Sequence, residues 1–472
     1  MSLRARAMLA VALTIGFYVL AIGLIAVLVR IVFIPNVPGR VLAFCIVGAG
    51  AIAISIIPRP SRFVAPGPRL NPAGQPRLFA ELEGVAEAVG EAMPEEVYVT
   101  PEMNAGVLQR GRRRVMVLGL PLMQVMTVSQ MRAVLAHEFG HYYGGDTRLG
   151  PWIYRTRETI ERTLSGLSRT SSFLQLPFLW YGRLFLRVTQ AVSRQQELAA
   201  DALAARTIGA APMMDGLRAL ARGSIAFGAY WQQEVVPLLE AGFQPPVTDG
   251  FSRFLAEPEM MQKVAEAAEA ELAKAKPNPY DSHPPDAERI AALAAMPPGP
   301  SQTDGAAAAS LVDGLEVIDS VLLIGVLKPG IQLRPITWAD AGNEALIPGL
   351  RDRVRRQAPL VSAYTVGWLP ELVKYADRLG QSEAGAAGRS VSPDRARSLG
   401  IGLAGSAFAV ALANSGWSAE SMPGRPVVMR RGDATLEPFG EVSRLASGEV
   451  DVTAWQQRCW DLGIRDVSLA PG

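Results

Sequence analysis

Two histidines four residues apart are the first residues in this sequence that could do metal chemistry. They lie in the segment His137-Glu138-Phe139-Gly140-His141, and the whole chain contains only three histidines. Positions four apart share one face of a helix, so both imidazoles could bind one ion from the same side. A glutamate next to the first ligand could take a proton from a water molecule on that ion. The pattern predicts a hydrolytic zinc site with Glu138 as general base.

A third ligand has to come from elsewhere in the chain, because a catalytic zinc ion usually takes three protein ligands and keeps a fourth position for water. Glu197 is the best candidate, within the segment SRQQELAAD that ends at Asp201. Asp201 is four residues further on, so it could support a zinc-bound imidazole from the same helix face. Spacing alone also allows a solvated helix face on which both carboxylates are surface charges.

Two uncharged segments near the N-terminus predict a membrane anchor. Residues 8–29 are uncharged over 22 positions, long enough to cross a hydrocarbon core of ~30 Å as a helix. Residues 41–58 form a second uncharged run, and the connector between the two is rich in turn-forming residues. We expect a hairpin of two membrane spans over residues 1–58. The alternatives are a signal peptide for the first run and a buried soluble helix for the second.

Flanking arginines predict the orientation of this hairpin. The connector carries only its bounding Arg30 and Arg40. Five arginines flank the outer ends of the two runs: Arg4, Arg6, Arg59, Arg62 and Arg69. Because positively charged flanks stay in the cytoplasm, we expect both ends of the hairpin, and the catalytic domain, on the cytoplasmic side of the cell (inner) membrane.

The elements that carry the motifs indicate a mainly helical α+β chain. Residues 129–143 and 193–208 are predicted helices that hold the two chemical segments, and Thr127 or Ser129 is the expected N-cap of the first. Residues 96–100 and 114–120 alternate as strands do and precede the histidines. The strands and helices together predict a small α+β catalytic core.

Shifts in composition divide the chain further. Residues 59–75 and 297–310 are rich in proline, glycine or small residues and are predicted linkers. They delimit a zinc peptidase domain at 76–296 and a C-terminal α+β region at 311–472, whose role the sequence does not indicate. The uncharged run near 398–414 is dominated by Gly, Ala and Ser, so we expect a buried soluble helix there.

The segment 150–192 allows two interpretations. Its apolar centre is interrupted by Pro177, Arg183 and Arg187. One interpretation is an interfacial helix with Trp180 and Tyr181 at headgroup depth. The other is a helix packed on the catalytic core.

Overall composition excludes several classes of protein. The 472 residues carry a formal net charge of +2, which gives no basis for nucleic-acid binding. The two cysteines, Cys45 and Cys459, are too few for a disulfide framework or a thiolate metal site.

Four features together resemble the HtpX-type and CAAX prenyl protease type 1 family of gluzincin peptidases: HEFGH, SRQQELAAD, the N-terminal hairpin and the segment SHPPDAERI. The resemblance covers roughly residues 76–295 and includes no part of 311–472. It implies one Zn²⁺ per chain on His137, His141 and Glu197, with Glu138 catalytic. Asp201 would then support the site or donate a proton.

The same resemblance suggests roles for four further residues. Asn104 and Ala105 occupy the place of an edge strand to which a substrate adds as a further strand, although a simple loop is the alternative. His283, in the S-H-P-P turn, could donate to the oxyanion of the reaction or occupy the open metal position at rest. A purely structural turn is its alternative, and Arg289 has a weaker claim to similar roles.

The sequence therefore predicts a membrane-anchored zinc endopeptidase that hydrolyses peptide bonds of membrane-associated or misfolded proteins. The alternatives are a prenyl-protein (CAAX-type) peptidase and a non-catalytic membrane scaffold. Expected partners are protein or peptide substrates and the lipid bilayer, and the oligomeric state is not indicated.

Overall fold

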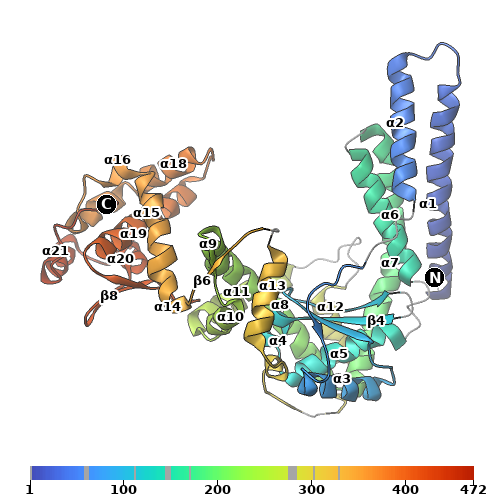
Figure 1. Cartoon of the computed structure of the whole chain (residues 1–472), viewed down its shortest axis with the longest axis horizontal. Coiled ribbons are helices and arrows are strands. Elements are labelled where there is room, and N and C mark those ends of the chain that lie inside the picture. The colour runs from blue at the N-terminus through green and yellow to red at the C-terminus, as the bar shows by residue number, and fades with distance from the viewer. Residues whose placement is uncertain are drawn as a thin grey trace. The chain divides into compact units, whose positions relative to one another are not determined.

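The computed structural model describes residues 3–57, 63–110, 113–143, 150–168, 172–274, 284–300, 303–327 and 330–472. They form two compact units, the first made of Met1–Gly223 with Ala267–Asp313 and the second of Ser224–Glu266 with Gly314–Gly472. The fold is mainly helical with small sheets, which confirms the expected α+β class (Figure 1). Residues 224–266 thus pack with the C-terminal region, whereas the domain boundaries placed at 296 and 311 stay predictions.

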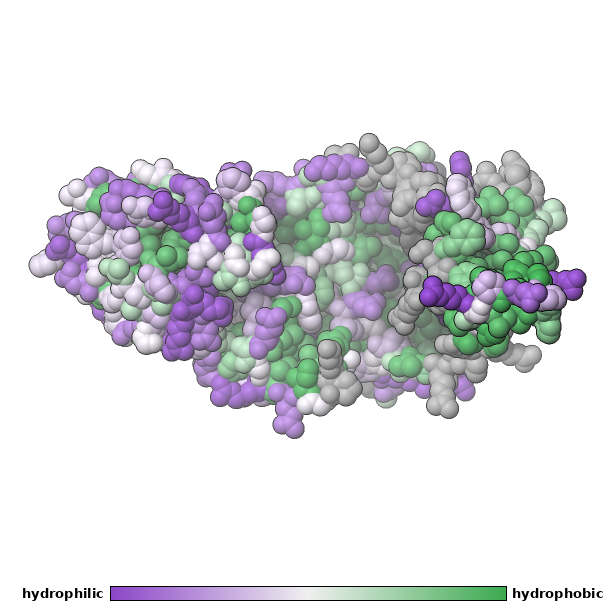
Figure 2. Space-filling model, turned by 90° about the horizontal axis from the view of Figure 1, so that it is seen from above, coloured by the Kyte–Doolittle hydropathy of each residue, from purple (hydrophilic) through white to green (hydrophobic). Residues whose placement is uncertain are grey.

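The N-terminal segment forms two long antiparallel helices, α1 (Leu3–Val32) and α2 (Gly39–Ile56). They contact each other along their length, and most of their remaining surface is apolar and exposed. In Figure 2, hydrophobic side chains gather at the end of the molecule that holds this pair. Both helices are long and apolar enough to cross a membrane, in the ranges Val11–Val32 and Gly39–Ile56.

The segment 150–192 packs against this pair. It forms α6 (Gly150–Ser168) and the first half of α7 (Ser172–Thr207), and both helices contact α1, while α6 also contacts α2. The buried side chains of this bundle include Phe17, Leu174, Phe178 and Phe185. The apolar stripe of α7 therefore faces the hairpin, an arrangement that neither sequence interpretation named.

A four-stranded sheet positions the helix that carries the two histidines. Its order is β1 (Arg69–Leu70), β2 (Glu96–Thr100), β4 (Arg113–Gly119) and β3 (Ala105–Arg110), with β2 and β4 parallel and the other pairs antiparallel. Among the described strands β3 is an edge, since it pairs only with β4. Both β3 and α3 (Pro76–Val89) contact α5 (Val128–Tyr143).

The described part of the second predicted linker, residues 297–310, forms backbone hydrogen bonds with the first unit. The backbone N–H of Val128 donates to Ala306 O (2.8 Å), and that of Ala308 donates to Met126 O (2.9 Å). Ser129 N–H donates to Asp304 O (3.2 Å) in the same way. The bonds from Val128 and Ser129 satisfy N–H groups at the start of α5 that have no partner within the helix. Residues 304–308 therefore hold the N-terminus of α5.

The remaining elements of the first unit are short. They are α4 (Leu120–Val125), α12 (Asp286–Ala294) and the 3₁₀ turn η2 (Ala308–Leu311). Two helices, α8 (Ala210–Tyr230) and α11 (Pro258–Lys274), contribute residues to both units.

The second unit is built around one buried helix, α19 (Pro393–Asn414). Twelve of its residues are buried, and α15 (Ile347–Arg355), α18 (Ala376–Ala386) and α20 (Pro438–Ser447) pack around it. By length and composition α19 is a third helix able to cross a membrane, yet 67% of its most apolar 18-residue stretch is buried within the protein. Small residues allow the neighbouring helices to approach closely, which accounts for its place in a protein core.

Short elements complete this unit. The helices are α9 (Val236–Glu240), α10 (Val247–Leu255), α13 (Leu315–Val326), α14 (Trp338–Ala341), α16 (Ala358–Val361), α17 (Leu369–Lys374) and α21 (Val452–Asp461). The strands are β5 (Phe243–Gln244), paired with β6 (Arg334–Pro335), and the antiparallel set β7 (Ser418–Glu420), β8 (Val428–Arg431) and β9 (Ala434–Leu436). Two π-helical turns, η1 (Trp231–Val235) and η3 (Gly342–Leu346), and the 3₁₀ turn η4 (Val366–Trp368) lie between them.

Candidate metal centre

Helix α5 fixes both histidines because its start and its buried face are well determined. Thr127 N–H donates to Gln130 Oε1 (3.0 Å), and Gln130 N–H donates to Thr127 Oγ1 (3.3 Å). This reciprocal pair is a capping box, and it defines Thr127 as the N-cap. Met131, Leu135 and Phe139 are fully buried on the opposite face. His137 and His141 therefore project from one side of a rigid helix toward α7.

A close approach of two helices brings the third ligand to the histidines. A side chain at Gly140 would begin 3.2 Å from the Cα and the Cβ of Ala200, closer than ordinary van der Waals contact. The absence of that side chain lets α5 and the second half of α7 lie against each other at this level. Glu197, three residues before Ala200 on α7, then faces both imidazoles. Sequence reasoning did not assign any role to Gly140 or Ala200.

The three side chains converge as a metal site requires. His137 Nε2 lies 3.5 Å from Glu197 Oε2, and His141 Nε2 lies 3.7 Å from Glu197 Oε1. One ligand atom from each residue lies within 4.8 Å of the others. Ligands at ~2.0–2.1 Å around a tetrahedral zinc ion stand about 3.4 Å apart. The two imidazoles and the carboxylate thus have the donor chemistry and the separations that suit Zn²⁺.

Asp201 stands behind the histidines and is held by a buried arginine. His137 Nδ1 lies 2.8 Å from Asp201 Oδ1. Arg289, from α12, donates through Nη2 to Oδ1 (2.6 Å) and through Nε to Oδ2 (2.8 Å). Asp201 is 2% exposed and Arg289 is 7% exposed. The hydrogen bond from Nδ1–H to Asp201 leaves Nε2 of His137 as the nitrogen for the metal.

Burial and hydrogen bonding shift the pKa values of Asp201 and His137 in opposite directions. Burial opposes the charge of Asp201, but hydrogen bonds from Arg289 and His137 outweigh it and lower the pKa of Asp201 below its usual value. Burial also disfavours the charged form of His137, yet hydrogen bonds with Asp201 and Glu197 raise its pKa to about 9. Sequence reasoning assigned Arg289 only a weaker claim to a role in the site. Its partner Asp201 is 88 residues away in the chain, so no local pattern reveals the pair.

The remaining predicted site residues fall into two groups. Glu138 is half-buried beside His137 on α5, where its charge helps to raise the pKa of that imidazole. His283 lies outside the described residues, so both of its proposed roles stay predictions.

Asn104 and Ala105 lie at the start of the edge strand. Ala105 is the first residue of β3 and pairs with Leu118, while Asn104 is exposed just before it. A side chain at Gly119 would collide with the backbone of Glu102 and Asn104, and Gly119 N–H donates to Asn104 O (2.7 Å). Gly119, which sequence reasoning missed, therefore holds the turn that leads into β3. Substrate binding by Asn104 and Ala105 stays a prediction.

The residues of the candidate metal site lie in a segment that matches a known protein family. Residues 72–296 match peptidase family M48. That segment is an M48 peptidase domain. The resemblance carried by HEFGH, SRQQELAAD and SHPPDAERI, which all lie in this range, is thereby confirmed at the level of the family.

Two similar proteins are both called Protease HtpX. The protein from Tolumonas auensis is 30% identical over 171 residues, which cover 31% of this chain and 58% of that relative. The protein from Idiomarina loihiensis is 29% identical over 164 residues, covering 31% of this chain and 57% of the relative. This chain thus spans little more than half the length of these relatives. No solved structure matches the chain significantly.

Proposed function

We propose that this protein is a membrane-anchored, zinc-dependent endopeptidase. The convergence of His137, His141 and Glu197, with Asp201 placed behind the first histidine, carries the proposal. Membership of residues 72–296 in family M48 supports it. The names of the two relatives describe proteases.

The residues of the M48 domain divide the chemistry between them. When bound to His137, His141 and Glu197, zinc supplies a Lewis acid that polarises the scissile carbonyl and acidifies a water molecule. Glu138, next to His137 on α5, would accept the proton of the attacking water and return it to the leaving amine. Asp201 orients His137. An extended substrate adds to the edge strand β3, beginning near Ala105.

We propose that α1 and α2 are the two membrane spans and that the M48 domain lies in the cytoplasm. The arginines at the outer ends of both helices support this orientation. Tyr181, whose hydroxyl donates to Leu13 O of α1 (2.6 Å), is 16 positions before Glu197 on the continuous helix α7. At 1.5 Å per residue, the metal site lies about 24 Å along α7 from that contact. The proposed substrates are therefore membrane-associated or misfolded proteins near the bilayer surface, as in membrane-protein quality control.

Metal analysis combined with a proteolysis assay tests the proposed function. We expect one zinc ion per chain, and its loss in His137→Ala, His141→Ala and Glu197→Ala. Glu138→Gln should retain zinc and lose cleavage of an unfolded protein substrate, because a base is removed and no ligand is. Full zinc occupancy in Glu197→Ala would reject the ligand assignment. Zinc binding without cleavage in the unmutated protein would favour a scaffold, and cleavage of prenylated peptides alone would favour a prenyl-protein peptidase.

A further inference from the structure

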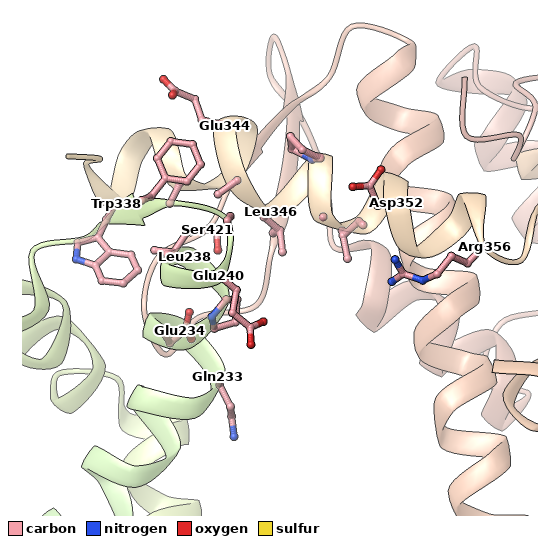
Figure 3. A pocket seen from close by; sticks show the side chains of 18 residues that line it. Gln233, Glu234, Leu238, Glu240, Trp338, Glu344, Leu346, Asp352, Arg356 and Ser421 are labelled. Atoms are coloured by element: carbon pink, nitrogen blue, oxygen red, sulfur yellow. The ribbon is translucent and has the colours of Figure 1, made fainter. Parts of the chain in front are cut away.

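The second unit contains a cavity that the peptidase chemistry does not use. It has a volume of about 690 Å³ and is formed wholly by residues of that unit. One wall consists of η1 and α9, and the other of η3 and α15 (Figure 3). Binding sites for small ligands and peptide side chains have ~300–1,000 Å³. Both walls include a π-helical turn, an uncommon element that occurs often at functional sites.

The charges that line this cavity are mainly negative. Four carboxylates and one guanidinium contribute: Glu234, Glu240, Glu344, Asp352 and Arg356. Glu344 is paired with Arg334 (2.7 Å) and its carboxylate points away from the cavity in Figure 3. Asp352 is paired with Arg355 (3.3 Å). The negative charge that remains inside belongs to Glu234 and Glu240.

Neither of these two glutamates has a cationic partner in the described part of the chain. Glu234 is half-buried, and its Oε1 accepts one hydrogen bond, from Gly424 N–H (3.3 Å). Burial raises the pKa of Glu234. Glu240 is exposed, and its carboxylate reaches into the space between the two walls in Figure 3. A partly desolvated carboxylate without a counter-charge gains most from an incoming cation.

The floor of the cavity is apolar and rigid. Leu238, Phe243 and Trp338 are between 4% and 7% exposed and line it together. The Trp338 indole N–H donates to Pro246 O (3.1 Å), which fixes the orientation of the ring. An apolar floor beside carboxylates suits lysine and arginine side chains, because their aliphatic stems are covered while their charged ends reach the acids.

We propose that this cavity binds a segment of polypeptide that carries lysine or arginine, and that its occupant is the basic cytoplasmic flank of a membrane-protein substrate. The cytoplasmic segments next to membrane spans are enriched in these two residues, so the preference would select proteins of the bilayer. The identification of the occupant as a substrate rests on the proposed peptidase function, whereas binding of the basic segment does not.

Peptide binding to the full-length protein in a non-ionic detergent tests the proposal. The probe is Leu-Lys-Ala-Lys-Ala-Lys-Leu, blocked at both ends and labelled with a neutral dye, and fluorescence anisotropy measures its Kd. Glu138→Gln is the background, so the peptide stays intact. We expect affinity at least about tenfold higher than for the same peptide with glutamate in place of lysine. The difference should shrink as the salt concentration rises to about 0.5 M. Empty micelles control for binding to detergent.

Three substitutions at the cavity test how its charges affect the affinity for the lysine peptide. Glu234→Gln should weaken binding by about tenfold, and its amide oxygen can still accept the Gly424 N–H bond. Glu240→Gln, at an exposed position, should weaken binding about threefold. Arg356→Gln should tighten binding about threefold, since it removes a repulsive charge. Glu371→Gln, a carboxylate of the same unit outside the cavity, is the matched control and should change nothing.

The possible outcomes distinguish a failure of the cavity proposal from a failure of the proposed peptidase function. Equal affinity for the lysine and glutamate peptides, or an unchanged Kd in both Glu234→Gln and Glu240→Gln, would overturn the proposal even if the protein is a zinc peptidase. Charge-selective binding by a protein that cleaves nothing would keep the cavity assignment and reject the peptidase function. If both hold, Glu234→Gln should raise KM for a lysine-flanked substrate and leave its kcat unchanged.

Discussion

The two halves of α7 pack against different parts of the protein, although they form one continuous helix of 36 residues. The first half packs Leu174, Phe178 and Phe185 against the N-terminal hairpin. The second half packs against α5 and brings Glu197 and Asp201 to the two histidines of the candidate metal site. The difference shows that one continuous helix joins the candidate metal site to the two apolar N-terminal helices. Each half should therefore respond to its own substitutions.

The largest effect is expected at Asp201, in the second half. Asp201→Asn removes the charge that compensates buried Arg289 and releases the Nδ1–H group of His137. We expect a loss of about 3–5 kcal/mol in stability and a fall of ~10–100-fold in zinc affinity. Thermal unfolding in detergent and zinc titration measure the two effects.

A matched control and a compensating variant sharpen this prediction. Asp215→Asn removes an exposed carboxylate that pairs with Arg218 and should change stability by less than about 0.5 kcal/mol. Replacing both Asp201 and Arg289 with leucine and methionine should recover part of the stability but none of the zinc affinity. Recovery of zinc binding in the double variant would mean that Asp201 does not orient His137.

The next effect concerns the contact between α5 and α7. Gly140→Val places two methyl groups where Ala200 and Leu203 now pack. We expect a cost of about 1–3 kcal/mol from overpacking and a drop in zinc affinity, since Glu197 is pushed away from the histidines. Gly84→Ala, in α3 with open space around it, should instead stabilise the protein by about 0.5–1 kcal/mol. Unchanged zinc affinity in Gly140→Val would show that the close approach does not position Glu197.

The contrast between the halves also explains what the sequence could predict. The two histidines of the candidate site follow a short local spacing, so His137 and His141 could be proposed from five residues. Glu197 as third ligand and Asp201 as its support came from the resemblance of the segment SRQQELAAD to a known family. In the sequence, Pro177 interrupts the apolar stripe of the first half of α7. Only the structure shows that this stripe packs against α1.

Contacts between distant segments were not predictable in the same way. The pairs Gly140–Ala200 and Asp201–Arg289 join elements far apart in the chain, and no spacing rule connects them. The acidic cavity is lined by three segments, near 233–243, 338–356 and 421. The α+β class, in contrast, followed from helical and strand periodicity, and β2 was expected at its observed residues, 96–100.

A smaller effect is expected in the first half of α7. Tyr181→Phe removes the hydroxyl that donates to Leu13 O (2.6 Å) and should cost about 1 kcal/mol of stability, with zinc affinity and kcat unchanged. A side chain at Gly16 would collide with that hydroxyl. Gly16→Ala should therefore destabilise the protein alone but be tolerated in combination with Tyr181→Phe. Additive costs in this double-mutant cycle would contradict the packing of α7 on α1.

The smallest effect on stability, and the most direct test of where the first half of α7 lies, concerns Trp180. Its side chain is exposed (69%), as are those of Phe173 and Leu176 on the same half. If this surface contacts lipid, brominated lipids should quench part of the tryptophan fluorescence, and that part should vanish in Trp180→Phe. Trp460→Phe, at an equally exposed position (63%) of the second unit, should leave the quenching unchanged, and neither substitution should alter stability by more than about 0.5 kcal/mol. Equal quenching in the unmutated protein and Trp180→Phe would place this half of α7 outside the bilayer. The hairpin α1–α2 would then be the whole anchor, and α6 and the first half of α7 would support it from the aqueous side.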